Sequence, residues 1–266
     1  MKQTLRGLSK GKKVGILSMI LPLFLMAEVH ANAQDVHNII DICTSSQRVM
    51  KDYALMGMKI EYHNPKKDLD AMVKRMEQEM EVMEKRAISN ALHAEELALH
   101  KAWKSIEAEL QKKPTKAGAL TLHHHVNTFA HHCEVMAEHL AKDSHTRGMY
   151  DEALLGRINL DVQDLAASYI MHAWGAEEDT EYYKEVKEIL ADYQKAYDEL
   201  EGADEKQVSA KIKAHLKTAN KHFMAFEFMA ESRSGRYVPL LIAKKADKIY
   251  TGIKKILKEE ESEVEK

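Results

Sequence analysis

The feature that most constrains this chain is how few of its residues interrupt helices. After residue 33 glycines are sparse, and long stretches of Ala, Leu, Met, Glu and Lys lie between three prolines, Pro65, Pro114 and Pro239. These five residue types form helices readily, and no stretch alternates apolar and polar residues as a half-buried strand would. The sequence therefore predicts an all-α fold made of long helices.

Capping residues, prolines and glycines divide the chain into separate helices. Asn64 and Pro65 form an N-cap followed by a proline in the first turn, and Pro114, Gly175 and Gly202 mark helix ends. The predicted helices span residues 36–62, 65–112 with an interruption near Ser89, 120–142, 150–174, 178–200, 204–232 and 239–258.

An internal repeat appears when the chain is shifted by 116 residues. Apolar residues spaced by three and four then coincide, which indicates one buried seam in each copy. In the clearest stretch, Val126, Cys133, Ala137 and Leu140 correspond to Ile242, Ile249, Ile253 and Ile256. The repeat predicts two tandem antiparallel helical-bundle units, residues 34–147 and 148–258, followed by a charged disordered tail over 259–266.

Residues 1–33 have the layout of a secretory signal peptide. A basic start precedes a mostly apolar run over residues 14–29, and the small residues Ala31-Asn32-Ala33 offer a cleavage site. The alternative is an anchor that is not cleaved. No later segment is long and apolar enough to cross a membrane, so we expect a periplasmic or secreted protein with no membrane span after cleavage.

The charge of the remaining chain limits its partners. Residues 1–33 carry five Lys or Arg and one acid, so the rest holds 34 basic and 41 acidic residues, a net charge of −7. This acidic balance argues against nucleic acid and against anionic lipid as partners. Because no Cys-x-x-Cys-His motif is present, covalent c-type haem is excluded, and we expect no cofactor.

Residues 122–140, LHHHVNTFAHHCEVMAEHL, hold six histidines. Three of them, His125, His132 and His139, recur every seven residues beside the apolar seam. Each step rises about 10.5 Å along a helix, so two of these side chains cannot share one ion. We interpret the row as the edge of a core, with a metal site on His125, His132 and His139 built across helices as the alternative.

The sulfur-containing residues fit buried seams. Cys133 lies within such a seam, and Cys43 lies one step off the seam of the first helix, so the pair forms either a disulfide between neighbouring helices or two free buried thiols. A methionine seam follows in the second helix and predicts a soft core rather than a copper site. Its members are Leu69, Met72, Met76, Met80 and Met83.

Residues 45–57, SSQRVMKDYALMG, resemble the signature of the periplasmic sensory module of type IV pilus chemoreceptors, which is related to the nitrate/nitrite sensor kinases (PilJ/NarX-like). The second half of that signature is matched, whereas Asp41 and Cys43 stand where arginines are expected. The matching residues are Ser46, Gln47, Arg48, Lys51 and Tyr53.

Residues 155–175, LGRINLDVQDLAASYIMHAWG, resemble a second copy of the signature. Asn159 and Asp164 replace two arginines in this copy, and Asp164 would repel an anion. The residues that fit are Gly156, Arg157, Gln163, Tyr169 and the closing Ala173-Trp174-Gly175.

The resemblance implies a non-enzymatic sensory module that binds a small anion or other small molecule and works with a membrane receptor or kinase. In the family, motif arginines hold the anion at a subunit interface, so the resemblance implies ligand binding by Ser46, Gln47, Arg48 and Arg157, with a homodimer left open. A surface role for Arg48, paired with Asp52, is the alternative.

No catalytic motif appears in the sequence, so we expect no enzyme. The rival function is a periplasmic His-rich metal-binding protein. A structural protein whose helices pack against a partner is the third alternative.

Overall fold

The computed structural model describes residues 33–86, 92–143, 149–204 and 208–264. These residues form helices and turns and contain no strand, which confirms the all-α class. The helices are α1 (Ala33–Gly57), α2 (Pro65–Arg86), α3 (His93–Leu110), α4 (Lys116–Asp143), α5 (Met149–Trp174), α6 (Asp179–Gly202), α7 (Ala210–Ala230) and α8 (Pro239–Val264). The predicted signal peptide and the predicted break at Ser89 lie outside the described residues, apart from Ala33.

Local chemistry marks the start of α2 and the end of α1. The Asn64 Oδ1 atom accepts a hydrogen bond from the Lys67 backbone N–H at 3.1 Å, which caps α2 before its first residue, Pro65. The prediction that the first helix continues to residue 62 is wrong, because α1 ends at Gly57. There Lys59 takes a left-handed φ of 57°, and the Ile60 N–H turns back to donate to the Leu55 carbonyl.

The last helix also differs from the prediction. Residues 259–264 were expected to be a disordered tail, but they continue α8 as far as Val264. Four of these six residues are Glu, which favours helix, and charge repulsion among them is insufficient to end the helix.

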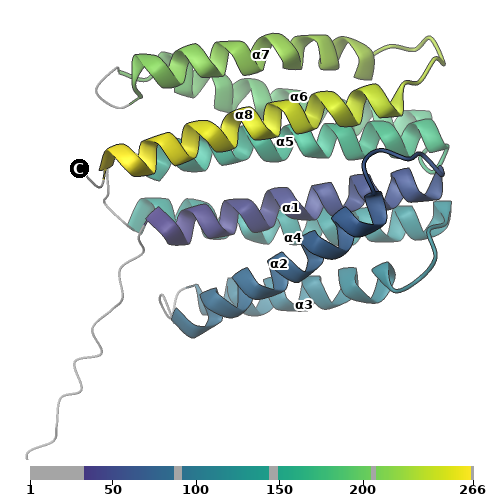
Figure 1. The fold of residues 1–266 in the computed structure, drawn as a ribbon, viewed down its shortest axis with the longest axis horizontal. Helices are drawn as coiled ribbons and strands as arrows, with labels where there is room; N and C mark the ends of the chain where they lie inside the picture. Colours follow the sequence, from purple (N-terminus) through teal and green to yellow (C-terminus); the bar gives the residue numbers. More distant parts are fainter. Residues whose placement is uncertain (1–32, 87–91, 144–148, 205–207, 265–266) are drawn as a thin grey trace, which may run out of the picture.

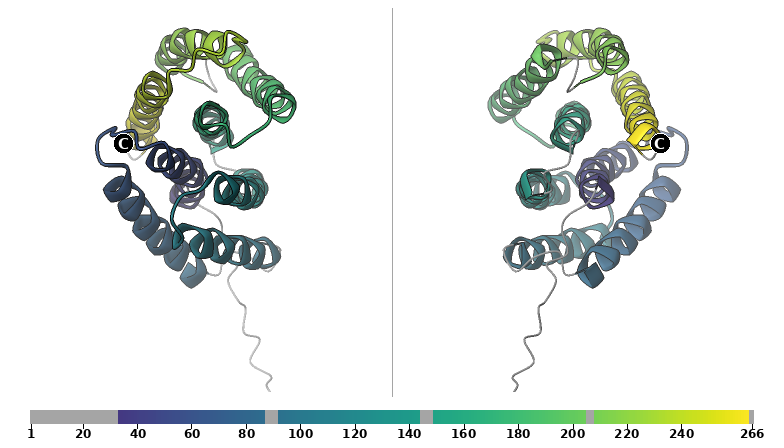
Figure 2. Two further views of the ribbon diagram at one scale, coloured as in Figure 1. Left: turned by 90° about the vertical axis from the view of Figure 1, so that its right-hand side faces the viewer. Right: turned by 90° about the vertical axis from the view of Figure 1, so that its left-hand side faces the viewer.

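The helices form two stacked groups around a shared centre. Figure 1 shows α5–α8 lying above α1–α4, and the end-on views of Figure 2 place α1 and α5 inside, with the remaining helices around them. The most extensive packing in the molecule is that of α1 against α5, and α4 also contacts α5. The two units therefore share one continuous hydrophobic core rather than closing separately.

The seams read from the sequence face this core. The methionine seam of α2 is buried throughout, and so is the α4 seam that contains Phe129 and Cys133, which confirms both as core. The internal repeat itself stays a prediction. No described helix has the length and apolar character needed to span a bilayer.

Candidate metal site

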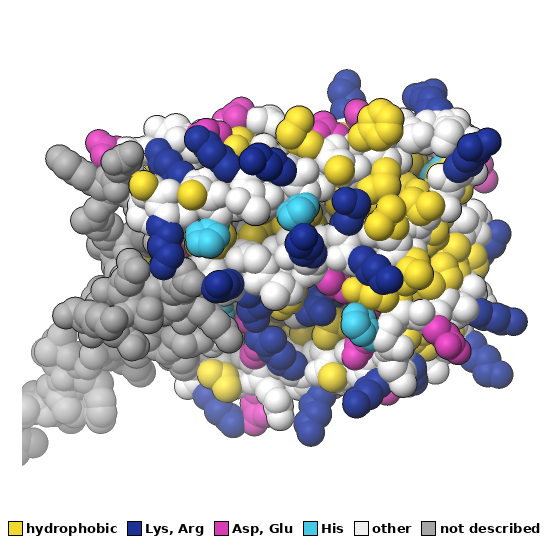
Figure 3. Space-filling view, turned by 45° about the horizontal axis from the view of Figure 1, so that its top comes forward, with side chains coloured by type: hydrophobic (Ala, Val, Ile, Leu, Met, Phe, Trp, Pro, Cys, Tyr) yellow, Lys and Arg dark blue, Asp and Glu magenta, His cyan; other side chains and the backbone are white. Residues whose placement is uncertain are grey.

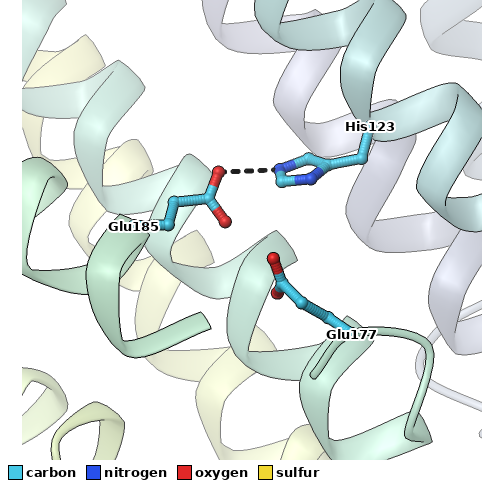
Figure 4. A group of neighbouring side chains, drawn as sticks. All are labelled: His123, Glu177 and Glu185. Atoms are coloured by element: carbon cyan, nitrogen blue, oxygen red, sulfur yellow. Dashed lines mark ion pairs between the residues drawn. The ribbon is translucent and has the colours of Figure 1, made fainter. Parts of the chain in front are cut away.

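A cluster of polar side chains lies where α4, α5 and α6 meet. It joins His123 of α4, Glu185 of α6 and Glu177 of the short α5–α6 connection, whose ligand-type atoms all lie within 4.8 Å of one another. Figure 4 shows the imidazole and the two carboxylates turned toward a common space. Two ligands held by one ion at about 2.1 Å lie at most about 4.2 Å apart, so small side-chain movements would complete such a site.

A fourth ionisable group adjoins the cluster from α5. The His123 Nε2 atom lies 3.1 Å from Glu185 Oε1 and 3.9 Å from Asp164 Oδ1. Burial alone would lower the pKa of His123, but hydrogen bonding and charge from Asp164 and Glu185 raise it to about 10. The imidazole therefore holds a proton when no other cation neutralises these carboxylates.

The carboxylates outnumber the positive charge available to them. Burial and the nearby Glu185 charge raise the pKa of Glu177 to about 7, and burial also raises the pKa of Asp164. The pKa of Glu185 is lowered because bonds from His123, Ser168 and Asn127 outweigh its burial. One imidazolium thus faces three carboxyl groups, an arrangement that a divalent cation would neutralise better.

Neighbouring polar side chains orient the ligand groups. Gln47 Nε2 donates to Asn127 Oδ1 at 3.0 Å, which turns the Asn127 Nδ2 atom toward Glu185 Oε1 at 3.1 Å and His123 Nε2 at 3.2 Å. Ser168 donates to the other Glu185 oxygen at 2.9 Å. His123 Nε2 cannot accept from Asn127 and donate to Glu185 at once, so one contact is unsatisfied in either protonation state.

Several acceptor atoms around the cluster have no donor. Asp164 Oδ1, Glu177 Oε2 and Gln47 Oε1 are buried without a hydrogen-bond partner. A buried acceptor without a hydrogen bond lowers the free energy of unfolding by roughly 1–3 kcal/mol. A hydrogen-bond donor or a cation would satisfy each of these three oxygens. The cluster is therefore incomplete when built from protein atoms alone.

The predicted ligand-binding residues of α1, Ser46, Gln47 and Arg48, lie in three different environments. Ser46 donates to the Cys43 carbonyl at 2.6 Å, and Gln47 joins the cluster through Asn127. The Arg48 guanidinium lies 4.3 Å from the centre of the Tyr250 ring of α8, so it faces another helix. These three side chains do not converge on one pocket.

Lys51 is a buried charged residue that links three helices. Its ammonium group contacts Asp247 of α8 and donates to Gln163 of α5 at 3.2 Å. Lys51 and Gln163 belong to the two stretches that resemble the sensory signature, and the structure brings them together as a contact between α1 and α5.

Arg157 has a full set of carboxylate partners. Its Nη1, Nε and Nη2 atoms lie 2.8 Å from Glu134, 3.1 Å from Asp161 and 2.9 Å from Asp192. A cavity of about 140 Å³ lies beside it, with Glu134 and Asp192 in its wall. Because each guanidinium nitrogen already has a carboxylate, this arrangement disfavours the anion site predicted at Arg157.

The histidines of the seven-residue row lie apart from the cluster. His132 Nδ1 is 2.9 Å from Glu95 of α3, His125 is half-buried, and His139 is exposed. Within the described residues, the group with metal-ligand geometry contains His123 and none of these three. The alternative metal site on His125, His132 and His139 stays a prediction.

The two cysteines lie next to each other in the core. Both thiols are free in the structure, and they are in hydrogen-bond contact between α1 and α4, while burial raises the pKa of each. Helices α1 and α4 are packed neighbours, as a disulfide between them would require. A disulfide between Cys43 and Cys133 stays a prediction.

Sequence reasoning missed the cluster because its members lie on three helices and a connection. A local signal was present: Asn127 follows His123 by four residues, and Ser168 follows Asp164 by four. Each spacing puts two polar side chains on one face of a helix whose neighbours are apolar. That pattern indicates a polar contact inside the core but does not name its partners.

The chain was compared with models of protein families, with curated proteins and with solved structures, and none of the three comparisons gave a match. The fold and the cluster therefore define the class: an all-helical bundle protein with a buried carboxylate–histidine site.

Proposed function

We propose that this chain is a non-enzymatic helical binding protein that holds a divalent transition-metal ion at His123, Asp164, Glu177 and Glu185. The observation that carries the proposal is the imbalance of the buried cluster, in which one imidazole faces three carboxyl groups and two carboxylate oxygens have no hydrogen-bond partner. Unpaired buried charge is costly, and a bound dication would satisfy these oxygens together.

The chemistry of the ligands restricts the ion. Imidazole nitrogen favours Zn²⁺, Fe²⁺ or similar metals over Mg²⁺ and Ca²⁺, whereas carboxylates are accepted by all of them. The spacing of the ligand atoms leaves room for one ion rather than an organic cation. Because Nε2 must lose its proton to bind, loading the site would release a proton from His123.

The proposed site favours metal binding, which the sequence offered as the rival function, but it uses other residues than His125, His132 and His139. It is also compatible with a sensory role. Gln47, which lies in the stretch resembling the sensory signature, supports Asn127 and through it the cluster. In a periplasmic or secreted protein, such a module would present its metal-loaded state to a membrane receptor or kinase.

The first test is metal binding by protein purified without an affinity tag and stripped with a chelator. We expect calorimetry at pH 7.5 to show one Zn²⁺ per chain, with a heat that varies with the buffer because a proton is released. Glu185→Gln keeps the shape but removes the charge, and we expect affinity to fall about 100-fold or more.

His132→Gln is the matched control, since His132 lies on the same helix but contacts Glu95. It should bind Zn²⁺ as the parent does. Absence of binding, or binding that survives Glu185→Gln but is lost when His125, His132 and His139 are replaced together, would contradict the proposed site.

A small anion beside Arg48 is the second candidate function. Arg48 Nε is buried without a hydrogen-bond partner, and the guanidinium offers a planar fork to an oxyanion. We expect calorimetry to detect nitrate or nitrite binding that Arg48→Ala abolishes and that Arg236→Ala, at an exposed position, leaves unchanged. Equal binding of each anion by Arg48→Ala and the parent would eliminate this function.

A further inference from the structure

The second unit carries a patch of exposed apolar side chains where α7 ends and α8 begins. Of nine large hydrophobic residues exposed in the described chain, five lie between residues 224 and 241. Phe228 is 77% exposed and Met224 60%, and the two share one face of α7 because they are four residues apart. The five are Met224, Phe228, Val238, Leu240 and Leu241, and they define the α7–α8 patch.

The α7–α8 patch forms a connected region of surface. α7 and α8 are packed neighbours joined by the connection over 231–238, so the last turn of α7 lies near the first turn of α8. Figure 3 shows hydrophobic side chains gathered toward one end of this face, with Lys and Arg side chains around and beside them.

The same segment holds a strong excess of positive charge. Residues 210–248 contain nine Lys or Arg and three acids, a net charge of +6, whereas the full chain carries −3. The remainder of the chain therefore carries −9, so charge is segregated between regions of the molecule. Exposed basic residues that flank the patch are Lys221, Arg233, Arg236, Lys244 and Lys248.

We propose that the α7–α8 patch docks on the surface of an anionic lipid bilayer. Its apolar side chains would enter the boundary between headgroups and acyl chains, and the Lys and Arg side chains would pair with lipid phosphates. The charge of the whole chain had argued against anionic lipid as a partner. That expectation used the net charge of the whole chain, which does not show that positive charge is concentrated near the α7–α8 patch.

The charge around the patch favours an anionic bilayer over a protein partner. Exposed Lys and Arg side chains flank the five apolar side chains, an arrangement typical of surfaces that bind anionic membranes. The cleft beside it is lined by Asp179, Thr180, Arg233, Gly235 and two tyrosines, Tyr183 and Tyr237, without an aliphatic side chain for a partner helix to pack against. A bilayer needs only shallow insertion together with charge attraction.

The test is sedimentation of the full chain with vesicles of phosphatidylglycerol and phosphatidylcholine, compared with phosphatidylcholine alone. We expect binding to the anionic vesicles that weakens in 0.5 M salt, since exposed charges are screened. Phe228→Ser combined with Leu241→Ser should lower the partition coefficient about tenfold or more, because two exposed apolar side chains are lost.

Val82→Ser combined with Leu97→Ser is the matched control, because these exposed apolar residues lie on α2 and α3. It should leave vesicle binding unchanged, and any binding by residues 1–32 is common to all variants. Glu185→Gln should also bind vesicles normally, so failure of the metal site would not affect this result.

Three outcomes would overturn the inference. One is equal vesicle binding by the parent and the Phe228→Ser, Leu241→Ser variant. Another is self-association that depends on the patch, measured by sedimentation velocity, without vesicle binding. The third is patch-dependent binding to an acidic protein or to DNA with none to anionic vesicles.

Discussion

Replacing Arg157 by alanine is expected to lower the free energy of unfolding by about 4 kcal/mol. The guanidinium contacts Glu134, Asp161 and Asp192, and Asp161 is buried. Removing the cation leaves carboxylates in the interior without compensation, and breaking a buried ion pair from one side typically costs about 3–5 kcal/mol. Urea unfolding followed by circular dichroism at pH 7.5 measures the change.

Two further variants separate this effect from ordinary loss of a surface charge. Lys66→Ala removes an exposed ion pair with Asp70 and should change stability by less than about 0.5 kcal/mol. Adding Asp161→Asn to Arg157→Ala should restore part of the loss, because it removes a carboxylate that has become unpaired. If Arg157→Ala unfolds at the same urea concentration as the parent, the structural role of Arg157 is wrong.

The metal-free protein is expected to be several kcal/mol more stable at pH 5 than at pH 8. Burial raises the pKa of Asp52, Glu134 and Glu177 to about 7 in each case. The folded state then binds more protons than the unfolded state between about pH 4 and pH 7, so stability falls as pH rises through this window.

Two residues of the metal-site cluster, His123 and Glu185, also make stability depend on pH. The pKa of His123 is raised to about 10, so its contribution is present below about pH 6.5 and is lost as pH rises toward 10, in the same direction as the acids. The pKa of Glu185 is lowered, so its contribution is lost only below about pH 4.5. Stability should therefore be greatest near pH 5.

Urea unfolding with a chelator present, at pH 5, 6, 7 and 8, provides the measurement. Asp52→Asn should raise stability at pH 8 and leave it nearly unchanged at pH 5, because the asparagine needs no proton to be neutral. Glu84→Gln, at an exposed position, is the control and should change stability by the same small amount at pH 5 and at pH 8. A stability that rises steadily from pH 5 to pH 8 would contradict the burial of these carboxyl groups.

Much of the fold could be read from the sequence because its causes are local. Pro65 and Pro239 begin helices, and spacings of three and four among the methionines identified the buried face of α2. Cys133 was placed in the core by the same periodicity. The errors occurred where a local rule was weak: α1 stops at Gly57 before any strong breaker, and α8 continues through a charged tail.

The site could not be read in the same way. The motif identifies Asp164 only as a replacement for an arginine, and it predicts that Arg157 binds a ligand. The structure surrounds Arg157 with carboxylates from α4, α5 and α6, and it places Asp164 beside His123. Apart from Asp161, which follows Arg157 by four residues on α5, each of these neighbours lies on another helix.

The sequence alone determined which segments are helices and which face of each helix is apolar, since both depend on residues within a few turns of one another. Only the tertiary structure decided that His123, Glu177 and Glu185 meet, and that a basic segment exposes an apolar patch. Contacts between side chains of different helices depend on the rotation and axial position of each helix relative to its neighbours. A shift of one residue turns a helix by about 100° and would separate these side chains.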